Sequence, residues 1–120
     1  MAKVYLTGIE ESVANSLQRA LAIEKHKIEH RAWSAPLEDY LDADIVFAGG
    51  DGKRYLTLLR GIRQARPALP VIVVTRIPET SEWLDALEAG ATDYCSAPFE
   101  LRQINWLMET VLRRVRSAAT

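Results

Sequence analysis

The sequence is poor in the residues that crosslink small proteins or bind metals in them. Its 120 residues include one cysteine, Cys95, and two histidines, His26 and His30. A single cysteine excludes an internal disulfide and a thiolate zinc site, and it is typical of a reducing compartment. We expect Cys95 to be a small core residue and both histidines to lie at the surface. The sequence therefore predicts no metal site and no cofactor.

Long apolar runs and an excess of charge are also missing. No run approaches the ~18 apolar residues of a membrane span, and the first residues lack a signal-peptide pattern. The 15 basic and 16 acidic side chains give a formal net charge of −1, so no overall field attracts nucleic acid. Hydrophobic residues make up 48% of the chain, as in globular domains. We expect one cytoplasmic domain over residues 1–120, without membrane contact or direct nucleic-acid binding.

Short apolar strands alternate with helical segments along the chain. Strands are predicted at residues 3–8, 27–33 (near a sheet edge), 44–48, 71–75 and 92–95. Helical segments are marked by Val13, Leu17 and Leu21; by Pro36 to Leu41; by Tyr55, Leu59 and Ile62; by Pro78, Leu84 and Leu87, ending at Gly90; and by the residues after Phe99. Such alternation requires crossover connections and hence a parallel sheet. The predicted fold class is α/β, a doubly wound five-stranded parallel sheet in three layers.

The last helix has one unusual side chain on its polar face. Its apolar residues fill one arc of a helical wheel: Leu101, Ile104, Leu107, Met108, Val111, Leu112 and Val115. Trp106 projects from the opposite side, between Arg102 and Arg113. Tryptophan and arginine are enriched at protein interfaces, so these three residues are a candidate protein-binding surface. The alternative, in which Trp106 only covers the arginine stems, stays open. Trp83 in the preceding helix is expected to be half-buried.

One stretch of the chain resembles a known family. Residues 69–100, LPVIVVT…DALEAGATDYCSAPFE, resemble the C-terminal half of response-regulator receiver domains: a strand ending in Thr, a helix closing on an Ala-Gly turn, Asp-Tyr, then Pro-Phe. Residues 58–70 match the preceding helix and loop. The resemblance covers essentially the whole chain and is weaker before residue 50. It implies a flavodoxin-like fold and a place in two-component signal transduction or a phosphorelay.

Receivers accept a phosphoryl group on an aspartate, with an acidic pair that holds Mg²⁺ and a lysine that neutralises the phosphoryl oxygens. Carried over position by position, the acidic pair falls on Gly8 and Ile9, the acceptor on Gly49 and the lysine on Ala97. The segment after Gly49 is also about two residues shorter than the family pattern. Glycine forms no acyl phosphate and isoleucine binds no Mg²⁺. The resemblance is therefore to a degenerate receiver, or pseudo-receiver.

Two receiver positions keep their residue type, namely Thr75 at the hydroxyl position and Tyr94 at the aromatic switch position. We interpret the chain as a phosphorylation-independent signalling module without enzymatic activity. Its expected partner is another protein or a second copy, bound through the last two helices, because the corresponding face carries output and dimerisation in the family.

Two alternatives remain at this stage. In the first, Asp51 replaces the missing acceptor, with Glu10 and Glu11 as Mg²⁺ ligands, because all three lie near the expected carboxyl edge of the sheet. In the second alternative, the chain senses a small ligand in the vacated pocket around Gly8, Gly49 and Thr75.

Overall fold

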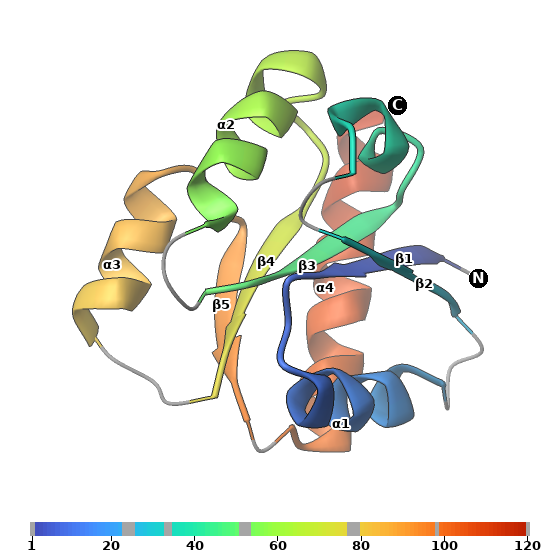
Figure 1. Cartoon of the computed structure of the whole chain (residues 1–120). Coiled ribbons are helices and arrows are strands. Elements are labelled where there is room, and N and C mark those ends of the chain that lie inside the picture. Colours follow the sequence, from blue (N-terminus) through green and yellow to red (C-terminus); the bar gives the residue numbers. More distant parts are fainter. Residues whose placement is uncertain are drawn as a thin grey trace.

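The computed structural model contains one parallel sheet of five strands in the order β2-β1-β3-β4-β5 (Figure 1). It describes residues 2–22, 26–32, 35–50, 54–76, 80–97 and 99–119. The strands are β1 (Lys3–Thr7), β2 (Lys27–Arg31), β3 (Ile45–Gly49), β4 (Val71–Thr75) and β5 (Asp93–Ser96). Every neighbouring pair is parallel. This is the flavodoxin-like, doubly wound order, and it confirms the predicted fold class.

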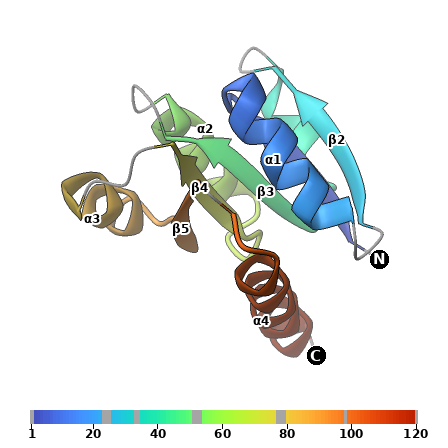
Figure 2. The same cartoon turned by 90° about the horizontal axis from the view of Figure 1, so that it is seen from below.

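Helices cover both faces of the sheet and complete the three layers. They are α1 (Glu11–Ala22), the 3-10 helix η1 (Leu37–Tyr40), α2 (Tyr55–Ala65), α3 (Thr80–Glu88) and α4 (Leu101–Ala119). One apolar cluster joins α1 and α4 to one face, and a second joins η1, α2 and α3 to the other. Figure 2 shows α3 and α4 flanking the edge strand β5. Each face of the sheet therefore has its own core.

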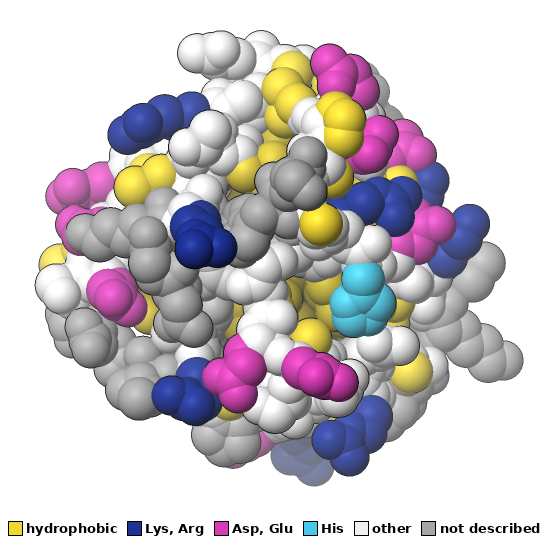
Figure 3. All heavy atoms as spheres, in the orientation of Figure 1, with side chains coloured by type: hydrophobic (Ala, Val, Ile, Leu, Met, Phe, Trp, Pro, Cys, Tyr) yellow, Lys and Arg dark blue, Asp and Glu magenta, His cyan; other side chains and the backbone are white. Residues whose placement is uncertain are grey.

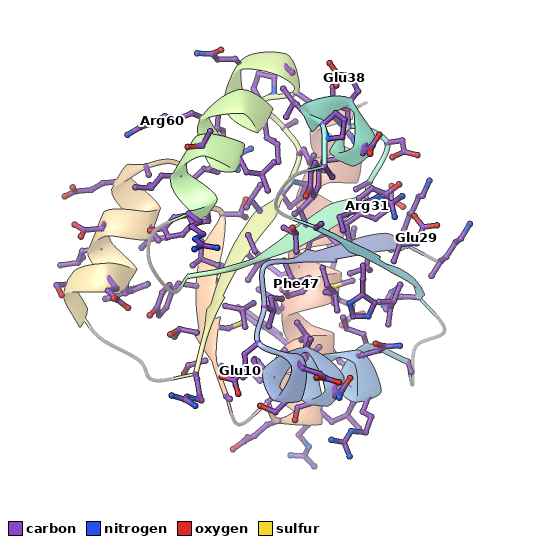
Figure 4. The ribbon with its side chains drawn as sticks, in the orientation of Figure 1. Glu10, Glu29, Arg31, Glu38, Phe47 and Arg60 are labelled. Carbon is purple, nitrogen blue, oxygen red and sulfur yellow. The ribbon has the colours of Figure 1, made fainter. Side chains whose placement is uncertain are left out.

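The central strands owe their stability to continuous apolar burial. Every residue of β3 and β4 is buried, as expected for parallel strands covered on both sides. Phe47 (labelled in Figure 4) lies in the α1–α4 cluster and is fully buried. Charged side chains of both signs are interspersed on the face drawn in Figure 3.

Several details differ from the sequence-based expectations. Strand β2 ends at Arg31 rather than residue 33, but it is the edge strand that the pattern predicted. Leu84 and Leu87, expected to mark the core side of α3, are 48% and 37% exposed, because α3 meets the core through the smaller Ala86. Leu101, placed in the core arc of α4, is 39% exposed, whereas the arc from Ile104 to Val111 is buried as predicted. Pro78, Pro98 and the side chain of Val115 lie outside the described residues.

The end of α3 is fixed by a glycine, as the sequence predicted. Gly90 has φ 104°, a left-handed conformation that glycine adopts without steric cost. Its N–H donates to the Leu87 carbonyl at 3.1 Å, and the Ala91 N–H donates to the Ala86 carbonyl at 3.0 Å. This pair of hydrogen bonds is a Schellman motif, and it turns the chain directly into β5.

A polar cluster joins β1 to the residues that follow η1. The Tyr5 hydroxyl donates to Asp42 Oδ1 at 2.6 Å, and Lys3 Nζ binds Asp42 Oδ2 at 2.5 Å. These contacts lower the pKa of Asp42 to about 2, with the Lys3 hydrogen bond as the largest cause. Tyr40 packs edge-on against Tyr5 and donates to the Ala32 carbonyl at 2.9 Å. Tyr40 and Leu37 thus connect the short η1 to the apolar cluster on this face of the sheet.

Candidate functional site

The receiver positions identified in the sequence converge at the carboxyl edge of the sheet. Gly8 follows β1, Gly49 ends β3, Thr75 ends β4 and Ala97 follows β5. Strands β1 and β3 are neighbours although β2 lies between them in the sequence, so the winding direction reverses at this point. Ligands of open α/β sheets bind at such a switch point. The fold therefore brings the four positions that were matched to the receiver pattern to one edge of the sheet.

Gly49 is closed in by the backbone of the β1–α1 turn. A methyl group at Gly49 would lie 2.1 Å from the Gly8 carbonyl oxygen and 2.7 Å from the Gly8 carbonyl carbon. Real Cβ atoms essentially never approach a neighbour below 3.0 Å. Gly8 itself has φ 64°, so this turn also uses the conformational freedom of glycine. Glycine at position 49 is thus required by packing, and the space above it is filled by Gly8.

The two other positions matched to charged receiver residues hold the uncharged Ile9 and Ala97. Ile9 is partly buried and packs against the α1–α4 cluster. The Ala97 N–H donates to the Thr75 carbonyl at 3.1 Å and so continues the β4–β5 pairing past Ser96. Within the described part of the chain, no three His, Cys, Asp or Glu side chains are grouped so that they could hold a metal ion.

The structure describes two of the three residues of the displaced-site alternative, Glu10 and Glu11. Glu10 (labelled in Figure 4) pairs with Arg76, Oε2 to Nη1 at 3.4 Å, and accepts a hydrogen bond from Ser12 Oγ at 2.8 Å. Glu11 is exposed in the first turn of α1. Asp51 lies outside the described residues. The Glu10 carboxylate is therefore committed to an arginine, and a bound cation would have to displace it.

The two retained receiver residues differ in their surroundings. Thr75 is 3% exposed at the end of β4, opposite Ser96 of β5. Tyr94 is partly buried in β5 and packs against the cluster formed with α2 and α3. Both side chains belong to the β4–β5 end of the sheet, next to α3 and α4.

An exposed apolar surface lies beside β5. Its members are large side chains of α3 and α4 with the following exposed fractions: Trp83 42%, Leu84 48%, Leu87 37%, Leu101 39% and Trp106 63%. Arg102, Glu109 and Arg113, which surround Trp106, are exposed as well. Single exposed apolar residues are ordinary, but several large ones on the two helices that flank the edge strand β5 are a candidate interaction site. We call these residues, together with Arg102 and Arg113, the α3–α4 surface.

The remaining sequence candidates have structural roles. Cys95 is buried, and burial raises the pKa of its thiol to about 12, with a smaller contribution from Asp93. His30 is exposed and hydrogen-bonds Gln18 Oε1 at 2.9 Å, whereas His26 is partly buried and accepts a hydrogen bond from the Ala2 N–H. No helix in the described ranges combines the length and the apolar character that crossing a bilayer demands.

Two features of the site were not foreseen from the sequence. The pairing of Glu10 with Arg76 had a sequence signal, because each residue follows a strand that ends at the same edge. The contact between Gly8 and Gly49 had a weaker signal, two glycines at the ends of strands that need not be neighbours. Their closeness depends on the strand order, which the alternation of elements alone does not determine.

Known proteins extend this picture. No protein-family model matches the chain. It is 39% identical over 77 residues to the protein PetR of Rhodobacter capsulatus, covering 64% of this chain and 31% of PetR. It is 31% identical over 122 residues to the transcriptional regulatory protein CreB of Escherichia coli, covering 98% of this chain and 53% of CreB. The chain thus spans about a third of the length of PetR and about half of the length of CreB.

Solved structures agree on the fold. The CheY-like response regulator receiver domain protein of Methanospirillum hungatei superimposes with a TM-score of 0.80 at 17% identity, covering 98% of each chain. This structure shows the shared fold, and the sequence matches show that the chain belongs to the response-regulator receiver domain family of two-component systems.

Proposed function

We propose that this chain is a phosphorylation-independent receiver domain, a pseudo-receiver that acts in the cytoplasm as a protein-binding module and not as an enzyme. The observation that carries the proposal is the closed backbone at Gly49, where the Gly8 carbonyl oxygen fills the space that an acceptor side chain would enter. A phosphoryl acceptor there would need both a carboxylate and room for it. The chain has neither, and it needs no Mg²⁺ or other cofactor for binding.

The α3–α4 surface is the proposed binding face. Trp106 has 63% of its area in water, and the core arc of α4 is complete without it. Burial of apolar area contributes roughly 25 cal/mol per Å², so a partner that covers Trp106 gains free energy that the monomer leaves unused. Arg102 and Arg113 supply charge and stacking beside it, and Trp and Arg dominate interface hot spots. Arg113 is only loosely engaged, since Glu109 lies 4.0 Å away.

The partner is a protein or a second copy of the chain. The relative CreB is a transcriptional regulatory protein almost twice as long as the segment that matches this chain. We infer from it that the domain passes a signal through protein contact and that this contact does not wait for phosphate. Tyr94 lies in β5, the strand that α3 and α4 flank. A change in the Tyr94 side-chain conformation could therefore transmit partner binding on these helices to the sheet.

The experiment compares Trp106→Ala with a matched control, Gln64→Ala on the exposed side of α2. Sedimentation velocity measures self-association, and capture by the immobilised chain measures partner binding in the presence and absence of acetyl phosphate. Trp106→Ala should weaken the interaction by about 2 kcal/mol or more, roughly 30-fold, if Trp106 is an anchor. The control should bind as the parent chain does, and acetyl phosphate should change neither. Unaltered association of Trp106→Ala together with a much lower melting temperature would overturn the proposal.

A further inference from the structure

A cleft separate from the carboxyl edge and from the α3–α4 surface lies between η1 and α2. Its volume is about 350 Å³, and it is lined by Ala35, Leu37, Arg54, Thr57, Leu58 and Gly61. Figure 3 shows hydrophobic side chains reaching the surface in the upper part of the view, where α2 and η1 meet. Ligand pockets typically measure roughly 300–1,000 Å³, so this cleft is at the small end of that range.

The polarity of the cleft is uneven along α2. Ala35, Leu37, Leu58 and Gly61 give it an apolar floor. Leu37 packs directly over Gly61, since a methyl group on Gly61 would lie only 3.2 Å from the Leu37 side chain. Arg54 lies at the other end, beside Thr57 in the first turn of α2. An apolar floor with one cationic end matches an amphiphilic anion.

Arg54 has no other evident task. It precedes α2, its side chain makes no capping hydrogen bond, and it is exposed. Among the described residues it takes part in no hydrogen bond or ion pair, whereas Arg63 in α2 and Arg66 directly after α2 donate to backbone carbonyls at 2.5–2.8 Å. The positive end of the α2 dipole lies beside it and adds to its attraction for an anion. The guanidinium fork suits a carboxylate, which it binds through two parallel hydrogen bonds.

We propose that the cleft between η1 and α2 binds a small amphiphilic carboxylate, with the carboxylate on Arg54 and the apolar chain against Leu37, Leu58 and Gly61. The volume holds on the order of ten heavy atoms, given ~30 Å³ for a water-sized group. A medium-chain fatty acid has this size and polarity. The inference does not depend on the proposed protein-binding function, because none of its residues belongs to the α3–α4 surface.

The test titrates the full chain with octanoate and follows backbone amide shifts by NMR. Binding should saturate, with the largest shifts at Leu37, Leu58 and Gly61. Arg54→Gln should weaken octanoate binding at least 10-fold. The matched control is Arg60→Gln: Arg60 is on the same helix, is exposed, and points away from η1 (Figure 4). It should bind octanoate as the parent chain does.

Two further arms separate the charge from the apolar chain. 1-Octanol should bind more weakly than octanoate, and its affinity should not respond to Arg54→Gln. Thr57→Phe, which fills the cleft from its exposed side, should abolish binding of both probes while the melting temperature stays near that of the parent. Absence of saturation, equal affinity of Arg54→Gln and parent for octanoate, or shifts centred on Trp83 and Trp106 would each overturn the proposal.

Discussion

The carboxyl edge of the sheet is tightly packed at Gly49, whereas the outer side of α4 leaves a large apolar side chain exposed to solvent. At Gly49 a single added carbon would lie 2.1 Å from the Gly8 oxygen, whereas Trp106, one of the largest side chains of the domain, is 63% exposed. In a phosphorylated receiver the edge holds the chemistry. Here the edge is closed by backbone and the apolar area faces solvent on the helices. Backbone thus fills the space beside Gly49, whereas most of the Trp106 side chain stays in contact with solvent.

The largest expected effect comes from adding a side chain at Gly49, where the Gly8 backbone leaves no space for one. Gly49→Ala must displace the Gly8 carbonyl, and overpacking of this kind typically costs about 1–3 kcal/mol and occasionally more. Since the obstacle is backbone, we expect the upper end, about 3 kcal/mol, in urea unfolding. Gly50→Ala is the matched control: its methyl would lie 3.0 Å from the Val73 side chain and at an ordinary 3.5 Å from the Val74 carbonyl oxygen, so it should cost less. Equal losses in the two variants would mean that the Gly8–Gly49 approach is not tight.

The next effect concerns Cys95, which lies in β5 and is buried in the apolar cluster formed with α1 and α4. Burial raises the pKa of its thiol to about 12, and the thiolate is the reactive form. The native chain should therefore react with a disulfide reagent at pH 8 at least about 100-fold more slowly than the urea-unfolded chain. Because the folded pKa is raised, the stabilising contribution is complete below the unfolded pKa near 9 and is lost as pH rises toward 12. Rapid labelling of the folded chain would show that β5 opens readily.

A smaller effect on the free energy of unfolding is expected at the exposed Trp106 of α4. Trp106→Ala should change the free energy of unfolding by no more than about 0.5 kcal/mol, as for other exposed positions. Ile104→Ala, two residues earlier on the buried side of the same helix, should cost about 2–4 kcal/mol. Both are read by urea unfolding monitored by circular dichroism. A loss at Trp106 comparable to that at Ile104 would place this side chain in the core.

The smallest effect is the response of the polar cluster under η1 to acid. The pKa of Asp42 is lowered to about 2, chiefly by Lys3, so its stabilising contribution is present above the unfolded pKa near 4 and is lost as pH falls toward 2. Melting curves between pH 5 and pH 2 should show a smaller decline for Asp42→Asn than for the parent chain. Asp39→Asn, an exposed neighbour on η1, is the control and should decline as the parent does.

Sequence patterns predicted the fold well because parallel strands buried on both faces, such as residues 71–75, have a composition that few other structures share. They placed the receiver positions at one edge because strand ends determine that edge. They failed at Leu84, Leu87 and Leu101, where helical periodicity predicts a core side but exposure depends on how far the helix extends beyond the sheet. The cleft beside Arg54 was not predictable, because it depends on the packing distance between η1 and α2.

Incubation of the full chain with acetyl phosphate and Mg²⁺, followed by intact mass measurement, tests the proposed loss of phosphoryl chemistry most directly. We expect no species heavier by one phosphoryl group, about 80 Da, and no rise in melting temperature with millimolar Mg²⁺, because only a ligand of the native state stabilises it. A phosphorylated species that maps to Asp51 and disappears in Glu10→Gln or Glu11→Gln would contradict it and would establish the displaced acceptor site instead.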